Sequence, residues 1–182
     1  PGNEELAAAL ERVADPAEAW AKAAEKLREI SGLTEKKDAK KSLLFRAARL
    51  LENDAKDDKG AEEAYREILE LDGEDEIARI ALEELKRRSG DAEGLVELLL
   101  EKADREEVSA DRAVVLREIA EVYESGLKDD ANAFVAWTQA LTEDPRDERT
   151  VREIERLAAG KNERWNEAIG SLNETVQATD DP

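Results

Sequence analysis

The chain has 182 residues and a formal net charge of −19, with 47 acidic and 28 basic side chains. A charge of this sign repels nucleic-acid phosphates and anionic lipid surfaces, so we expect neither nucleic acid nor membrane as a partner. No apolar run approaches the length of a membrane span. The sequence contains no cysteine, which fits a reducing compartment, and a cytoplasmic location is expected.

Residues that favour helices dominate the composition, and 41% of the chain is hydrophobic. The apolar residues recur at helical spacing, and no segment alternates long enough to predict a strand. The pattern predicts ten helices, at 4–13, 17–31, 36–54, 58–71, 75–89, 92–104, 110–125, 130–142, 147–159 and 163–177.

Helix ends are marked by small and capping residues. Four glycines follow periodic segments and are predicted to end helices: Gly32, Gly90, Gly126 and Gly160. Three positions have residue types that start helices and are predicted to open the next ones: Asp15-Pro16, Thr34 and Asp91.

The chain repeats itself at a spacing of 72 residues. This shift places Lys56-Asp57-Asp58 on Lys128-Asp129-Asp130, and Tyr65 on Trp137. It also pairs Leu6 with Ala78, and it sets Trp20 opposite Ala92; one inserted residue brings Trp165 to the same place. Each unit of this length contains two helix pairs of about 36 residues, which is the signature of a stacked helical repeat.

Two of the pairs resemble the tetratricopeptide repeat (TPR). The family's pattern of bulky, small and aromatic positions is filled in one pair by Leu116, Ile119, Ala120, Tyr123, Ala133, Trp137, Ala140 and Pro145. An earlier pair fills it with Leu44, Ala47, Ala48, Leu51, Ala61, Tyr65, Ile68 and Gly73. The turn inside these pairs is one residue longer than usual, Ile68 replaces a small residue, and Gly73 replaces proline.

The resemblance implies an all-α, right-handed α-solenoid of about five antiparallel helix pairs. The first helix of each pair would line a concave groove. We expect one helical-repeat domain over residues 1–182, with pairs at 4–31, 36–71, 75–104, 110–142 and 147–177, and we expect it to be a segment of a longer protein.

Catalysis finds little support in the residue types. The sequence has no histidine and no cysteine, the commonest general base and thiol nucleophile, so we expect no enzyme activity, no cofactor and no metal site. The acidic run 72–76 lacks the ligand spacing of a calcium loop and predicts a turn between helix pairs. The three tryptophans are interpreted as packing residues.

The family's register predicts which residues face the groove. Positions seven apart share one helix face, and three first helices place acids there: Glu4 and Glu11, Glu76 and Glu83, Glu148 and Glu155. Neighbouring groove positions carry Phe45, Arg49, Arg79, Arg117 and Glu121. Arg79 is expected to neutralise Glu76 and Glu83 in part. The asparagines of the family's carboxylate clamp are absent, so that specificity is not expected.

These residues predict a protein-interaction scaffold that binds a peptide, a helix or a partner domain in an acidic groove and favours a basic partner. Two alternatives remain open: an acidic decoy or chaperone for basic proteins, and a regulatory repeat segment of a larger multidomain enzyme. One basic island contains Lys36, Lys37, Lys40, Lys41, Arg46 and Arg49. It is interpreted as a solvated helix face that could also receive an acidic tail.

Overall fold

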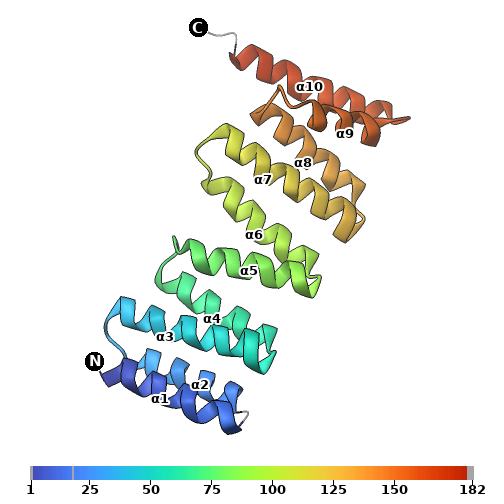
Figure 1. The fold of residues 1–182 in the computed structure, drawn as a ribbon. Helices are drawn as coiled ribbons and strands as arrows, with labels where there is room; N and C mark the ends of the chain where they lie inside the picture. The colour runs from blue at the N-terminus through green and yellow to red at the C-terminus, as the bar shows by residue number, and fades with distance from the viewer. Residues whose placement is uncertain (1, 18, 180–182) are drawn as a thin grey trace. The chain divides into compact units, whose positions relative to one another are not determined.

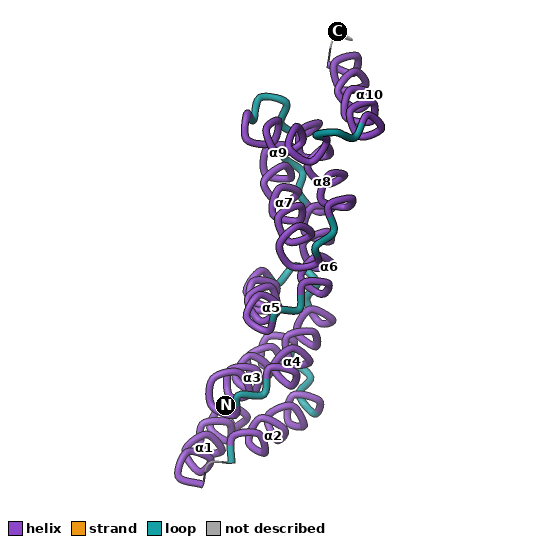
Figure 2. The backbone as a smooth tube through the Cα atoms, turned by 90° about the vertical axis from the view of Figure 1, so that its right-hand side faces the viewer, coloured by secondary structure: helices purple, strands orange, loops and turns teal. Residues whose placement is uncertain are grey.

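The computed structural model describes residues 2–17 and 19–179, and among their side chains those of 4–12, 19–161, 163–171 and 173. In these ranges the regular structure is entirely helical (Figure 2). Ten α-helices follow one another along the described chain (Figure 1). Their bounds are α1 Gly2–Ala17, α2 Trp20–Gly32, α3 Lys37–Arg49, α4 Asp58–Leu71, α5 Glu76–Ser89, α6 Ala92–Arg105, α7 Ser109–Val122, α8 Asp130–Glu143, α9 Glu148–Ala158 and α10 Asn162–Thr179. The all-α helical-repeat fold is therefore confirmed.

Two predicted helix starts were wrong. The backbone of α1 continues through Asp15 and Pro16 to Ala17, so this dipeptide does not open α2. Thr34 closes a helix instead of opening one, because its hydroxyl donates a hydrogen bond of 2.7 Å to the carbonyl of Ile30. The next helix begins only after Lys36.

The extra residue in the two TPR-like pairs becomes a π-helical turn. Helix α3 runs directly into the π-helix η1 (Leu50–Ala55), and α7 runs into η2 (Tyr123–Leu127). A π-turn accommodates one inserted residue without breaking the helix. Each π-turn ends at a left-handed lysine, Lys56 with φ 58° or Lys128 with φ 56°.

Glycine ends only some of the helices as predicted. Gly90 and Gly160 adopt φ values of 74° and 73°, which fit the predicted helix ends. The prediction for Gly126 was wrong, since it lies inside η2 and Lys128 takes the left-handed position two residues later. A Cβ at Gly126 would lie 2.6 Å from the Cβ of Ala92, so close packing against α6 explains the glycine.

Aspartates start the helices that follow these turns. Asp57 accepts a hydrogen bond of 3.0 Å from the backbone N–H of Gly60, and Asp129 accepts one of 3.0 Å from Asn132. Asp91 does the same for Gly94 at 3.0 Å, as predicted for the start of α6. These carboxylates satisfy backbone donors that the first helical turn leaves without partners.

The chain divides into two compact units, Pro1–Ser89 and Gly90–Pro182. We call them the first unit, with α1 to α5, and the second unit, with α6 to α10. Each unit has its own buried residues. The residues at the TPR-like positions that lie in helices are buried in both pairs, except Tyr123, which is half-buried. The expectation of one domain over residues 1–182 remains a prediction.

The aromatic residues at the repeat position make equivalent contacts. The Trp137 side chain is 1% exposed, and its Nε1 donates a hydrogen bond of 2.9 Å to Glu124. The Tyr65 hydroxyl donates one of 3.0 Å to Glu52, and both partners are shifted by 72 residues. Trp165 was wrongly interpreted as a packing residue, because it is 36% exposed on α10.

Candidate functional site

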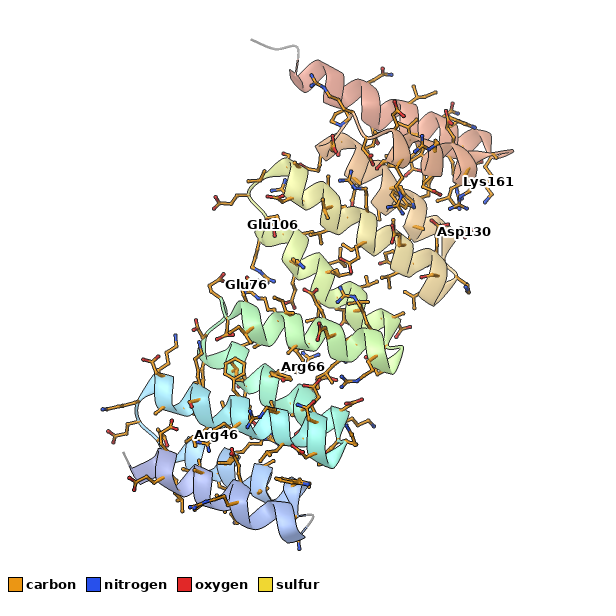
Figure 3. The ribbon with its side chains drawn as sticks, in the orientation of Figure 1. Arg46, Arg66, Glu76, Glu106, Asp130 and Lys161 are labelled. Carbon is orange, nitrogen blue, oxygen red and sulfur yellow. The ribbon has the colours of Figure 1, made fainter. Side chains whose placement is uncertain are left out.

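The predicted acids of α1 are held by an arginine of α3. The Nε of Arg46 donates a hydrogen bond of 2.7 Å to Glu11, and its Nη1 lies 3.3 Å from Glu4. Figure 3 labels Arg46 where α3 passes α1. Ser42 adds a hydrogen bond of 3.2 Å to Glu4. One guanidinium therefore pairs with both predicted groove acids and offsets about half of their summed charge, most closely that of Glu11.

In α5 the predicted groove residues stabilise the preceding turn. Arg79 donates to the carbonyl of Gly73, and its Nη1 lies 3.0 Å from Glu76, the pairing that the sequence predicts. Glu83 is buried and pairs with Arg87 at 3.2 Å. Arg79 and Glu83 are thus buried in the protein and offer little surface to a partner.

The second unit places its predicted groove residues differently. Arg117 lies 3.4 Å from Asp144 and 3.2 Å from Asp147, and it braces the turn between α8 and α9. Glu121 pairs with Arg149.

Helix α9 keeps its acids at the surface. Glu148 is exposed and lies 3.6 Å from Arg152. Glu155 is also exposed, and within the described part of the chain it makes no ion pair. Both predicted acids of α9 therefore present accessible negative charge.

Cations brace equivalent turns in the two units. Lys41 lies 2.6 Å from Asp72 and also contacts Asp75, and the hydrogen bonds to these carboxylates raise the pKa of Lys41 to about 12. In the second unit Arg117 pairs with Asp144 and Asp147, which lie 72 residues after Asp72 and Asp75. Residues 72–76 form the predicted turn. Within the basic island, Lys37, Lys41 and Arg46 are therefore engaged in ion pairs.

Phe45 packs within its own helix pair. Its ring meets Tyr65 edge-on, with ring centroids 6.3 Å apart and an angle of 64° between the ring planes. The Phe45 side chain is half-buried, so part of its surface stays accessible.

A hollow of about 470 Å³ lies where α1 passes into α2 and α3 enters η1. Its lining residues are Ala8, Glu11, Arg12, Trp20, Arg49, Leu50 and Asp54. Two of them, Glu11 and Arg49, were predicted groove residues. Arg12 and Arg49 are exposed and make no ion pair with the side chains that the structure describes.

The composition of this hollow suits a peptide side chain. Trp20, Leu50 and Ala8 supply apolar surface, and the charged lining residues supply donors and acceptors for hydrogen bonds. Trp20 is half-buried, so part of its indole ring is accessible. The register did not predict Arg12, which lies in α1, or Asp54, which lies in the π-helix η1 that follows α3.

A second hollow of about 370 Å³ lies between α2, α3 and α4. Its lining includes Arg28 and Glu67, which are joined by a hydrogen bond of 3.0 Å from Arg28 Nε. Arg28 also lies 3.2 Å from Glu63. The charged groups of this second hollow are therefore already paired with one another.

No known family profile and no curated protein sequence matches the chain. Among solved structures, the chain is similar to the crystal structure of MamA. The two share 15% sequence identity with a TM-score of 0.46, over 90% of this chain and 91% of the other. "MamA RS-1 ArsTM double mutant" is similar at 15% identity and a TM-score of 0.46, with coverage of 100% and 99%.

Among the residues that the structure describes, no helix combines the length and apolar character needed to cross a bilayer. No group of three or more potential metal ligands gathers in the same ranges.

Acid should destabilise the protein through its capping and bridging carboxylates. Hydrogen bonds lower the pKa of Asp72, Asp129 and Asp147 below the ordinary value of 3.8: the first from Lys41, the second mainly from the N–H of Asn132, the third mainly from the Thr150 hydroxyl. A lowered pKa contributes stability above the unfolded pKa, and this stability is lost as pH falls through the folded pKa. The free energy of unfolding in urea should therefore drop between about pH 5 and about pH 3.

The matched control for this titration is Asp129→Asn, which keeps a capping side chain but removes the titrating charge. Its stability should fall less steeply over the same pH range than that of the wild type. Parallel curves for the two proteins would contradict the role assigned to Asp129.

Proposed function

We propose that the chain is a non-catalytic protein-interaction module that binds a peptide, a helix or a partner domain on its first-helix face. By this face we mean, within the first unit, the surfaces of α1, α3 and α5 that carry the predicted groove residues and, separately within the second unit, those of α7 and α9. The observation that carries the proposal is the hollow beside α1, because Glu11 and Arg49, assigned to the groove from the repeat register, both line it. A concave surface lined by an aromatic ring together with charged side chains is typical of peptide recognition.

A binding role fits the chemistry better than catalysis. The sequence has no histidine or cysteine, and many of its carboxylates brace turns or pair with arginines. Such groups are engaged in holding helices together and are not arranged around a reacting centre. The proposal accordingly includes no cofactor.

The proposed partner is a protein with basic residues near its binding segment. The net charge of −19 attracts cationic partners over a distance and raises their association rate. Glu148 and Glu155 on α9 are the exposed acids of the predicted register that would contact them. Glu4 and Glu11 contribute less, because they share the positive charge of Arg46.

One alternative function is a decoy or chaperone for basic proteins in which surface charge alone acts. Exposed carboxylates outside the predicted register favour it: Glu93 and Glu97 on α6 are exposed and make no ion pair among the described side chains. A function as the regulatory segment of a larger enzyme is compatible with the same binding face.

Filling the hollow should weaken peptide binding. Random peptides displayed on phage are selected on the wild-type chain, and a selected peptide is then titrated against Ala8→Trp, which places a large ring in the hollow without a change of charge. Because Ala8 is exposed, the fold should persist, and the affinity should fall at least about tenfold, or about 1.4 kcal/mol. Fluorescence anisotropy of the labelled peptide measures this change.

The matched control is Ala110→Trp, at an exposed alanine of α7. Equal affinity of wild type and Ala8→Trp would exclude the hollow as the binding site. Raising the salt from about 0.15 M to about 1 M separates the two functions, since exposed charges are screened beyond a few ångströms at the higher concentration. The decoy function would be favoured by two results together: loss of all binding at about 1 M salt, and equal affinity of Ala8→Trp and wild type at about 0.15 M salt.

A further inference from the structure

The hollow beside α1 replaces a close contact of the repeat. The 72-residue shift places Trp20 on Ala92 and Asp54 on Gly126. In the second unit these two positions pack directly, since a Cβ at Gly126 would lie 2.6 Å from the Cβ of Ala92. In the first unit Trp20 and Asp54 both line the hollow of about 470 Å³. The hollow is therefore a departure from the repeat and not a gap that every repeat leaves.

Two cations of the hollow also depart from the repeat. The same shift places Arg49 on Glu121 and Arg12 on Glu84. By contrast, the aspartates that cap α4 and α8 and the carboxylates that bond the repeat aromatics are kept at this shift. The first unit thus carries two positive charges where the aligned positions are acidic. The packing that the repeat preserves does not require these two charges.

Neither guanidinium is matched by an acid among the described side chains. Arg49 and Arg12 are exposed and make no ion pair there, and the Nε of Arg12 only donates a hydrogen bond of 3.4 Å to the carbonyl of Ala8 in its own helix. Most other described arginines pair with carboxylates, as Arg46 does with Glu11. Arg49 lies on α3, which packs against both α2 and α4, so this unpaired cation belongs to an inner helix.

Two acids share the lining of the hollow, and one of them is already paired. Glu11 accepts the hydrogen bond of 2.7 Å from Arg46, whereas Asp54 is exposed and makes no ion pair with the described side chains. The two unpaired guanidiniums therefore share the hollow with one unpaired carboxylate, which leaves one positive charge to be matched. A carboxylate supplies one negative charge, and its two oxygens accept parallel N–H donors of a guanidinium. The second charge of a phosphate dianion would stay unbalanced.

We infer that the hollow takes one acidic side chain of the bound peptide, an aspartate or glutamate, whose carboxylate is held by Arg49 and Arg12. The inference rests on the proposed function and deepens it, because it names the ligand chemistry of the same hollow. An apolar residue beside this acid packs on Trp20. The net charge of −19 repels a peptide with many acids, so the recognised segment carries this single acid among basic residues.

Phage-selected peptides test this inference on the full chain. The sequences enriched on the wild type should share one aspartate or glutamate. A selected peptide is labelled, and its C-terminus is amidated so that only side chains carry carboxylates. Its affinity, measured by fluorescence anisotropy, should fall at least about tenfold for Arg49→Gln and by a similar factor when its acid is replaced by the corresponding amide. The two changes together should weaken binding little more than either alone, since both remove the same contact.

The matched control is Arg146→Gln, at an exposed arginine between α8 and α9 that also makes no ion pair with the described side chains. It changes the net charge equally and should bind as the wild type does. Thermal melting by circular dichroism verifies that each variant is folded, as expected for substitutions at exposed positions. A peptide that Ala8→Trp weakens but Arg49→Gln binds as the wild type does overturns this inference and leaves the proposed function standing. A peptide that Ala8→Trp binds as the wild type does overturns both.

Discussion

Replacement of Ala120 by tryptophan is expected to unfold the second unit or to cost at least about 3 kcal/mol of its stability. Ala120 is fully buried in α7 and belongs to the same buried cluster as Ala133 of α8 and Trp137. Alanines at these positions allow the axes of the two helices to approach to about 8–10 Å. An indole ring at Ala120 has no space, so α7 and α8 would have to separate.

Urea unfolding followed by circular dichroism measures this effect. Ala110→Trp is the matched control, since it adds the same ring to the exposed side of the same helix and should change stability by no more than about 0.5 kcal/mol. An unchanged unfolding midpoint for Ala120→Trp would show that the repeat register of α7 is incorrect.

Removal of the Trp137 ring should be almost as damaging, at about 3–5 kcal/mol for Trp137→Ala. The ring is buried in the centre of the second unit, its Nε1 bonds Glu124, and the Arg149 guanidinium lies 5.7 Å from its centroid. The variant leaves a large cavity and removes both polar contacts. The loss should appear as a lower midpoint of urea unfolding.

The variant Trp137→Phe separates packing from hydrogen bonding. It keeps an aromatic ring but removes the donor to Glu124, so it should cost less than Trp137→Ala. Because Tyr65 bonds Glu52 in the equivalent place, Tyr65→Phe should cost about 1 kcal/mol in the first unit. A larger loss from Trp137→Phe than from Trp137→Ala would contradict the packing role.

Helix content and helix pairing were predictable because they depend on local and repeated patterns. Apolar spacing placed the helices to within a few residues. The 72-residue repeat matched Tyr65 to Trp137, and the structure gives both the same kind of carboxylate partner. The sequence also revealed an extra residue in two pairs. The sequence did not reveal its conformation. The backbone of the structure shows that it forms a π-turn, which ends at Lys56 in one pair and at Lys128 in the other.

The electrostatics of the first-helix face could not be predicted from one helix at a time. Arg46 reaches Glu11 and Glu4 across 35 and 42 residues of sequence, and the distance between their side chains depends on how α1 and α3 pack. The repeat register identified which residues share a face. It did not identify which of their charges are balanced by a neighbouring helix.

The exposure of Trp165 and the hollow around Trp20 were missed for a similar reason. The alignment treats Trp20, Ala92 and Trp165 as equivalent, although their exposure depends on which helices lie on either side. Likewise Asp54 faces the hollow only because η1 turns the end of α3 in that direction. Such features arise from neighbouring elements and have no signature within one repeat.

The central claim is that a partner binds on the first-helix face beside α1, and mapping a bound peptide by NMR tests it most directly. A phage-selected peptide is titrated into the ¹⁵N-labelled chain, and the amide and indole shifts are followed. The proposal predicts that the largest changes fall on Ala8, Arg12 and Arg49, and on the indole N–H of Trp20. Changes confined to Arg28 and Glu67 beside the second hollow, or spread evenly over exposed acids of both units, would contradict it.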